Sequence, residues 1–95
     1  SFQYVSAAIA QNSIEFTNIN IGPIPTKDKL TIKFDNQYQN INFCITSVSG
    51  QIVKMGTLKL NEKEASINID EFANGVYFLK INSQNKTGIY KFAKG

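Results

Sequence analysis

The stretch that decides the fold is Phe72-Ala73-Asn74-Gly75-Val76-Tyr77-Phe78-Leu79-Lys80-Ile81. The pair Asn74-Gly75 tolerates positive φ angles, so the backbone can bend sharply there at little cost. After the bend the side chains alternate, and one face of the resulting strand carries Tyr77, Leu79 and Ile81. The opposite face is also apolar near the bend and becomes polar only at Lys80. Because both faces begin apolar, we predict a central strand of a sheet.

Tyr77 stands at the start of this strand, just after the turn at Gly75. In immunoglobulin-like sandwiches a tyrosine at such a place sends its ring into the core and its hydroxyl back to an upstream backbone group, an arrangement called a tyrosine corner. We therefore predict structural roles for Tyr77 and Gly75. Leu79 takes the place of the second disulfide cysteine of antibody domains, and we expect it to fill that volume.

The size and composition of the chain indicate one small domain. Its 95 residues, 42% of them hydrophobic, are enough for a single core whose stability is about 5 to 15 kcal/mol. No apolar run approaches the roughly 20 residues of a membrane helix. Ser1 is not followed by a basic-then-apolar leader, and we expect the sequence to be a fragment whose leader lies elsewhere.

Charge and cysteine content exclude several classes of function. All ten basic residues are lysines, and a formal charge of +3, evenly spread, does not argue for nucleic acid as a partner. We interpret the lysines as solvated surface that also guards strand edges. Cys44 is the single cysteine and histidine is absent, which excludes an internal disulfide, a cysteine-based metal cluster and a Ser-His-Asp triad. We expect a structural Cys44 and no cofactor.

Short apolar and polar alternations separated by turn residues run through the chain. We expect strands at residues 13–17, 30–34, 41–48, 51–55 with its continuation at 57–60, 65–69, 76–81 and 89–94. About seven short strands without a convincing helix predict an all-β fold, an immunoglobulin-like antiparallel β-sandwich. We assign residues 13–95 to this domain and residues 1–12 to a linker or to a remnant of whatever domain precedes it.

The connections between these strands have their own signals. Pro23 and Pro25 lack amide donors, so they predict a rigid extended corner that ends a ladder. Gly50 predicts the turn of a hairpin. Gly56 interrupts the second arm of that hairpin, where we expect a bulge or a bend. Residues 82–88 are polar, and we expect a loop there before the last strand.

From about residue 21 to residue 94 the chain resembles the type A C-terminal sorting domain of proteins exported by the type IX secretion system of Bacteroidetes. Four pieces carry the resemblance in the family's order: Gly22-Pro23-Ile24-Pro25, Val48-Ser49-Gly50-Gln51-Ile52-Val53, the stretch 72–81, and the final strand with Lys91 and Lys94. The family's opening motif is Tyr-Pro-Asn-Pro. Gly22 and Ile24 replace its tyrosine and asparagine, so the roles of those two side chains are not carried over.

This resemblance implies a recognition module without chemistry of its own. Such a domain lies at the far end of a larger secreted protein and directs its covalently joined N-terminal cargo across the outer membrane. The partners it implies are the outer-membrane translocon and a sortase-like peptidase. The peptidase removes the domain and either releases the cargo or links it to an anionic lipopolysaccharide, so the mature protein is secreted or held at the cell surface.

Lys91 and Lys94 are our candidates for direct contact with the export machinery. Lys91 points away from the face that carries Tyr90 and Phe92, and we expect Lys94 to lie at a frayed chain end. An open sheet edge could take part in the contact, and self-association through edge strands stays open as an alternative. The other motif residues are predicted to be structural: Pro23, Pro25, Gly50, Gly75 and Tyr77.

Two alternatives belong to other classes of function. A carbohydrate-binding or adhesive module of an extracellular enzyme would present exposed coplanar aromatics, for which Tyr38 and Phe78 are the candidates. An enzyme is the weaker alternative, because no triad, metal site or phosphate loop can be assembled. Glu62 and Glu64 are paired carboxylates, but they stand beside a lysine in a polar turn, which is typical of solvated surface.

Overall fold

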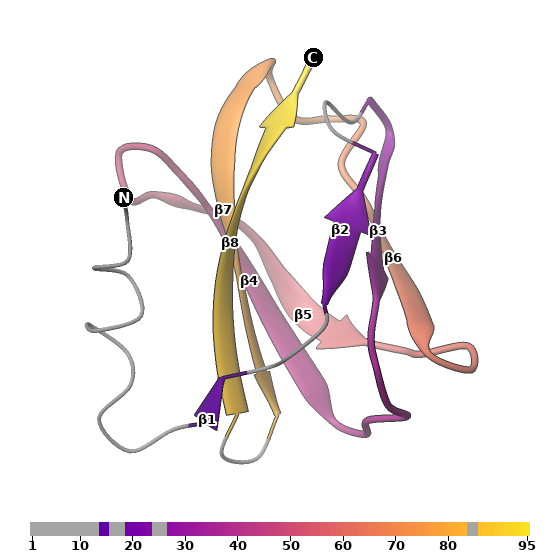
Figure 1. The fold of residues 1–95 in the computed structure, drawn as a ribbon. Coiled ribbons are helices and arrows are strands. Elements are labelled where there is room, and N and C mark those ends of the chain that lie inside the picture. The colour runs from indigo at the N-terminus through magenta and orange to yellow at the C-terminus, as the bar shows by residue number, and fades with distance from the viewer. Residues whose placement is uncertain (1–13, 16–18, 24–26, 84–85) are drawn as a thin grey trace.

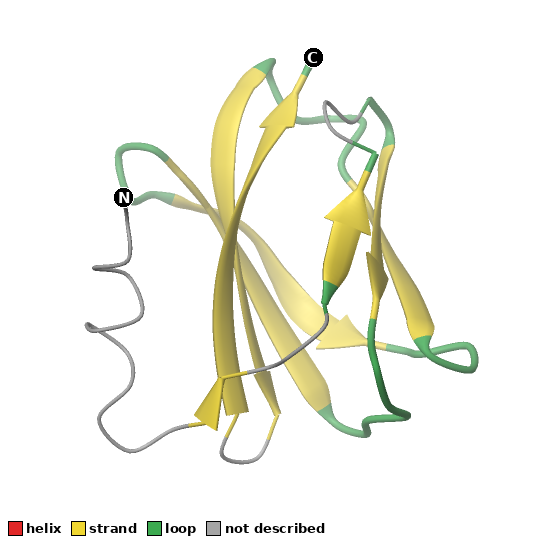
Figure 2. Cartoon of the chain, viewed as in Figure 1, coloured by secondary structure: helices red, strands yellow, loops and turns green. Residues whose placement is uncertain are grey.

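The computed structural model describes residues 14–15, 19–23, 27–83 and 86–95, and in these residues it contains strands and loops but no helix (Figure 2). The strands are β1 (Ile14–Glu15), β2 (Asn20–Gly22), β3 (Lys29–Lys33), β4 (Ile41–Ser47), β5 (Ile52–Leu58), β6 (Glu64–Asn68), β7 (Gly75–Ser83) and β8 (Lys86–Lys94). Accordingly, the described chain has no helix that could cross a membrane. The predicted linker at residues 1–12, together with Ile24 and Pro25, lies outside the described residues.

The strands form two sheets that pack face to face (Figure 1). The larger sheet has the order β1-β8-β7-β4-β5, and the smaller has the order β2-β3-β6. Neighbouring strands are antiparallel except β1, which runs parallel to β8. The prediction of an immunoglobulin-like antiparallel sandwich with about seven strands is confirmed, the two-residue β1 being an eighth. β7 lies between β8 and β4, so it is the central strand that its two apolar faces predict.

The core lies between the two sheets and follows the alternation of the sequence. In β3, β4, β6 and β7 every second residue is buried. The core residues are Leu30, Ile32, Phe34, Ile41, Phe43, Ile45, Leu58, Ala65, Ile67, Ile69, Tyr77, Leu79, Ile81 and Phe92. Each side chain is removed from water by the opposite sheet, and this burial supplies most of the free energy that holds the sheets together.

The tyrosine corner predicted at Tyr77 is present. The Tyr77 hydroxyl donates a hydrogen bond of 2.6 Å to the backbone oxygen of Ala73, four residues upstream. Its ring lies between two other rings, with centroids 5.0 Å from Phe72 and 5.7 Å from Phe92. Tyr77 thus joins the loop before β7 to the last strand. Leu79 is fully buried, as expected for a residue that fills the volume of the missing disulfide.

The predicted bulge at Gly56 is wrong. Gly56 lies within β5, directly opposite Phe43 in an unbroken register, and the ladder shifts instead between Ile45 and Thr46. A Cβ atom at position 56 would lie 3.2 Å from Cε2 of the Phe43 ring. The glycine therefore makes room for a core aromatic side chain, a use of glycine that a single sequence does not distinguish from a bulge.

The predicted loop at residues 82–88 is also wrong. β7 continues to Ser83 and β8 begins at Lys86, so most of this polar segment is strand. Its polar side chains bond to each other and to a nearby loop: Thr87 Oγ1 donates to Asn82 Oδ1 at 3.0 Å, and Ser83 Oγ donates to the backbone oxygen of Gln39 at 3.1 Å. These contacts stabilise a strand whose composition resembles that of a loop.

Candidate recognition site

The last strand, β8, has an exposed position in the larger sheet. It pairs with β7 along its whole length, from Lys86 opposite Ser83 to Lys94 opposite Gly75. On its other side β1 pairs with it only at Lys86 and Thr87. Residues 91–94 therefore lie at the outer edge of the sheet, where no described strand pairs with them (Figure 1). Such an edge can accept a further strand.

Lys91 and Lys94 do not share a face of this sheet. Because side chains alternate along a strand, residues three apart point to opposite faces. Lys91 is exposed and lies opposite Phe78 on the outer face, the face of the larger sheet that points away from the smaller sheet. Lys94 is half-buried and shares the inner face with Phe92. The expectation of a frayed Lys94 is wrong, because this residue is still in the ladder, opposite Gly75.

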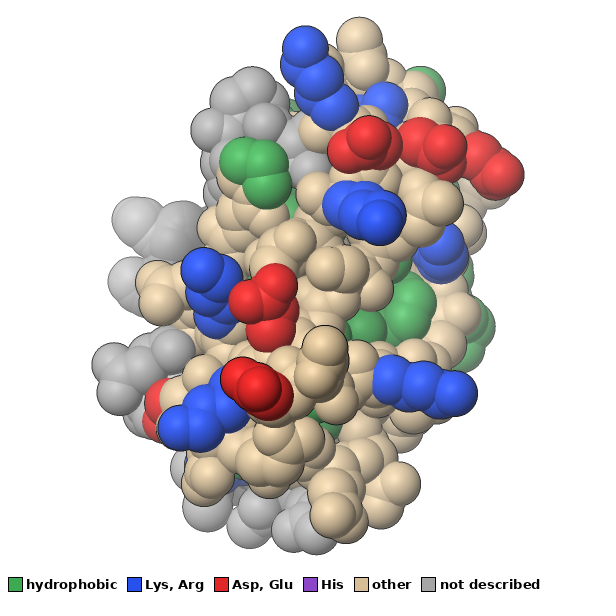
Figure 3. All heavy atoms as spheres, turned by 90° about the vertical axis from the view of Figure 1, so that its right-hand side faces the viewer, with side chains coloured by type: hydrophobic (Ala, Val, Ile, Leu, Met, Phe, Trp, Pro, Cys, Tyr) green, Lys and Arg blue, Asp and Glu red, His purple; other side chains and the backbone are tan. Residues whose placement is uncertain are grey.

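Lysines and acidic residues are unevenly distributed among the described elements. The four long strands of the larger sheet, β4, β5, β7 and β8, contain no aspartate or glutamate. They contain the lysines Lys54, Lys80, Lys86, Lys91 and Lys94. The described acidic side chains lie in loops and in β6: Asp28, Asp35, Glu62, Glu64, Asp70 and Glu71. Figure 3, which views the molecule from the side of the smaller sheet, shows lysines and acidic residues intermingled there.

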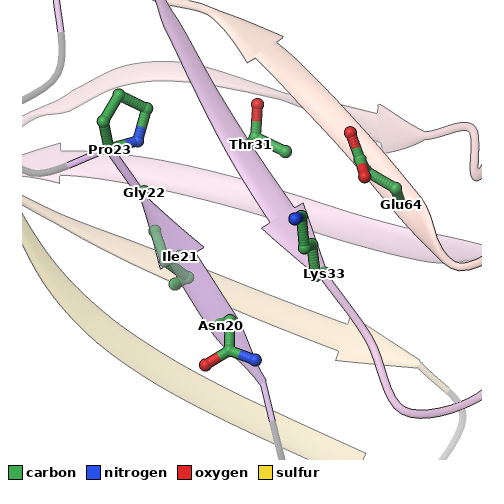
Figure 4. Close-up of a pocket in the computed structure, with 7 residues that line it drawn as sticks. All are labelled: Asn20, Ile21, Gly22, Pro23, Thr31, Lys33 and Glu64. Carbon is green, nitrogen blue, oxygen red and sulfur yellow. The ribbon is translucent and has the colours of Figure 1, made fainter.

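A shallow groove on the smaller sheet involves the opening motif (Figure 4). It is lined by Asn20, Ile21, Gly22, Pro23, Thr31, Lys33 and Glu64. Lys33 and Glu64 lie opposite each other in the ladder between β3 and β6. A Cβ atom added at Gly22 would meet no atom within 4 Å, so the groove has room for a larger side chain there. The described residues contain no cluster of histidine, cysteine, aspartate and glutamate that could hold a metal ion.

The remaining motif residues are dispersed over the fold. Gly50 has a φ of +90° in the turn between β4 and β5, and Gly75 has a φ of +152° at the start of β7. Both are conformations that glycine adopts without strain. Pro23 is exposed at the end of β2 and follows a cis peptide bond. These residues shape three separate turns and do not meet in one site.

Tyr38, predicted to be an exposed aromatic, is half-buried. Its ring packs edge-on against Phe34 with a centroid distance of 5.6 Å. Its hydroxyl donates to Asp35 Oδ1 at 3.0 Å and accepts from Lys86 Nζ at 3.1 Å. Phe78 is half-buried on the outer face. The bonds of Tyr38 hold the loop before β4 against the start of β8, a contact between distant segments that no local sequence signal reveals.

Comparison with protein families now decides the identity. Residues 20–94 match the secretion system C-terminal sorting domain. The chain belongs to this family. It is a type IX sorting domain of the kind found in Bacteroidetes, and the family signals export to the cell surface or secretion. The match covers β2 to β8, which are all the described strands of the two sheets except β1. The suspected resemblance is thus confirmed over most of the chain.

Two further comparisons add no closer relative of this sorting domain. None of the curated proteins matches it significantly. Among solved structures it is similar to the sulfur carrier protein SoxY from Chlorobium limicola f thiosulfatophilum, with 13% sequence identity and a TM-score of 0.43. That alignment covers 97% of this chain and 93% of the other.

Proposed function

We propose that the domain docks on the outer-membrane translocon of the type IX system through the edge strand β8. A sortase-like peptidase then separates it from an N-terminal cargo that has passed through the periplasm and the outer membrane. The family match over residues 20–94 supports the sorting role. The observation that carries the docking proposal is the position of residues 91–94 at the edge of the larger sheet.

The edge of β8 is suited to rigid recognition. An edge strand offers backbone amide and carbonyl groups to an added strand, and main-chain hydrogen bonds then supply affinity. Phe92, with 2% of its surface exposed, anchors β8 in the core beside Tyr77. Lys91 faces solvent between two core-facing neighbours. A partner therefore meets a preformed strand, which limits the entropy lost on binding.

The carbohydrate-binding alternative gains no support from the described surface. Its large exposed hydrophobic residues are aliphatic: Val48, Ile52, Val53, Met55 and Val76. Sugar-binding platforms rely on exposed aromatic rings. Tyr38 is held by Asp35 and Lys86, so its ring is not available as a flat platform.

The proposal is tested by fusing the domain to the C-terminus of a reporter protein in a bacterium that has the type IX pathway. We expect export of the reporter in the parent strain and its retention in a strain without the translocon. Export of equal amounts from both strains would refute the proposal.

A charge-reversed variant tests the contact at β8. Lys91→Glu is expected to lower export roughly tenfold, because a reversed charge at the edge opposes docking of a partner selected for lysine. The matched control is Lys63→Glu, since Lys63 is an exposed lysine in the turn before β6. Both variants should unfold at the parent temperature, because exposed lysines contribute little to stability. Equal export of the two variants would exclude Lys91 from the docking site.

A further inference from the structure

The exposed aliphatic residues of the described chain gather in one region. Those with the largest exposed fractions are Val48 at 70%, Met55 at 67%, Ile52 at 56%, Val53 at 41% and Val76 at 38%. Val48 lies in the turn between β4 and β5, three others lie in β5, and Val76 is the second residue of β7. Scattered single apolar residues are normal on a protein surface, but a contiguous group indicates an interaction site.

The strand register places Ile52, Met55 and Val76 of this group, together with Phe78, on the outer face of the larger sheet. Ile52 lies opposite Thr46, which lies opposite Phe78, which lies opposite Lys91. A second row across the same strands runs Met55, Cys44, Lys80 and Ile89. Adjacent strands are about 4.8 Å apart, so each row is continuous. The exposed neighbours of these residues are Val48, in the adjoining turn, and Val53, at the register shift of β5. We call Val48, Ile52, Val53, Met55, Val76 and Phe78 the outer-face patch.

The charged side chains that the structure describes on this face have one sign. Lys80 and Lys91 are exposed beside the outer-face patch, and none of β4, β5, β7 and β8 contains an acidic residue. A second copy packed on the same face would bring Lys80 and Lys91 of both copies into one interface, and like charges in one interface are unfavourable. A surface with apolar residues bordered by carboxylates would instead bury the patch and pair with both lysines.

We infer that the outer-face patch is the docking surface for a protein whose contact region is apolar and bordered by aspartate or glutamate. The inference rests on the proposed function and specifies the partner as a component of the export machinery. Lys91 belongs both to the edge of β8 and to the outer face, so one partner can cover the two together. The docking site then consists of the edge of β8 and the outer face of the larger sheet.

A variant with a polar outer face tests this inference in the reporter fusion. It combines Val48→Thr, Ile52→Thr, Val53→Thr, Val76→Thr and Met55→Gln. Threonine keeps the β-branched shape that strands favour, so the fold is expected to persist. We expect export about tenfold lower than that of the parent fusion, with an unchanged unfolding temperature. The control is Lys33→Gln with Lys63→Gln, which changes exposed positions in β3 and in the turn before β6 and should leave export unaltered.

The outcomes separate this inference from the proposed function. If the parent fusion requires the translocon but the polar variant is exported equally well, the sorting role stands and the inference is overturned. Two measurements on the purified domain test other occupants of the patch. If the parent domain binds phosphatidylglycerol vesicles and the polar variant does not, the occupant of the patch is a membrane. That result would overturn the inference. If the parent domain forms a dimer in sedimentation and the polar variant does not, the occupant of the patch is a second copy of the domain. That result would also overturn the inference.

Discussion

Tyr77 combines a ring contact and a hydrogen bond, and the two can be separated by substitution. Tyr77→Phe removes only the hydroxyl that donates to Ala73, and we expect a loss of about 1 kcal/mol in the free energy of unfolding. Tyr77→Ala also opens a cavity between Phe72 and Phe92, and should cost about 3 to 5 kcal/mol. Urea denaturation measures both. Equal losses for the two variants would contradict the assignment of the ring to the core.

Gly56 and Phe43 form a coupled pair at the same scale. Gly56→Ala places a Cβ atom 3.2 Å from the Phe43 ring, so we expect a loss of about 1 kcal/mol from crowding. The control is Gly56→Ala made in a protein that already carries Phe43→Leu, because leucine lacks the ring atoms that would crowd the new Cβ atom. In that background Gly56→Ala should cost little, and a double-mutant cycle measures the coupling. Additive effects would show that Phe43 is not the reason for the glycine.

Replacing Gly22 with alanine is expected to stabilise the domain, whereas the same replacement at Gly56 is expected to destabilise it. Its added Cβ atom meets no neighbour within 4 Å, and its backbone is not in the left-handed region. Gly22→Ala should therefore raise the free energy of unfolding by about 0.4 to 1 kcal/mol, because alanine reduces the entropy of the unfolded chain. Thermal or urea unfolding checks this. A loss of stability would mean that the backbone at the opening motif needs glycine after all.

At the scale of the elements, the pairing of β7 with β8 was only partly predictable. The apolar alternation from Val76 to Ile81 identifies a strand, but the polar residues that follow it look like a loop in the sequence. They remain in strand because Ser83 bonds to the distant Gln39 and Thr87 bonds to Asn82 across the ladder. Such partners are set by tertiary packing, which a local pattern does not contain.

The hydrogen bond of Ser83 gives a test at this scale. Ser83 is 5% exposed, and Ser83→Ala leaves the backbone oxygen of Gln39 without this donor. We expect the free energy of unfolding to fall by about 1 kcal/mol. Thr57→Ala serves as the control, because its hydrogen bond to Asn42 is exposed to solvent and should contribute less. A larger loss for Thr57→Ala would argue against the role of Ser83 in this hairpin.

At the scale of the whole molecule, alternation, turns and the tyrosine signal were sufficient to predict the sandwich, and the motif order predicted the family. The candidate site was harder to predict from the sequence. The sequence puts Lys91 and Lys94 close together, whereas the strand places them on opposite faces. The pairing of Lys91 with Phe78, and of Cys44 with both Met55 and Lys80, depends on the register of β5, β4, β7 and β8. That the four long strands of the larger sheet contain no acidic residue becomes apparent only after the strand bounds are known.

The central claim is that the export machinery recognises the edge of β8 together with the outer face of the larger sheet. Amide hydrogen exchange of the domain, free and bound to the purified translocon, tests it most directly. We predict slower exchange on binding for amides of residues 91–94 and of β5, with β2 and β3 unchanged. Protection confined to β2, β3 and β6, with β8 exchanging as in the free domain, would contradict the account.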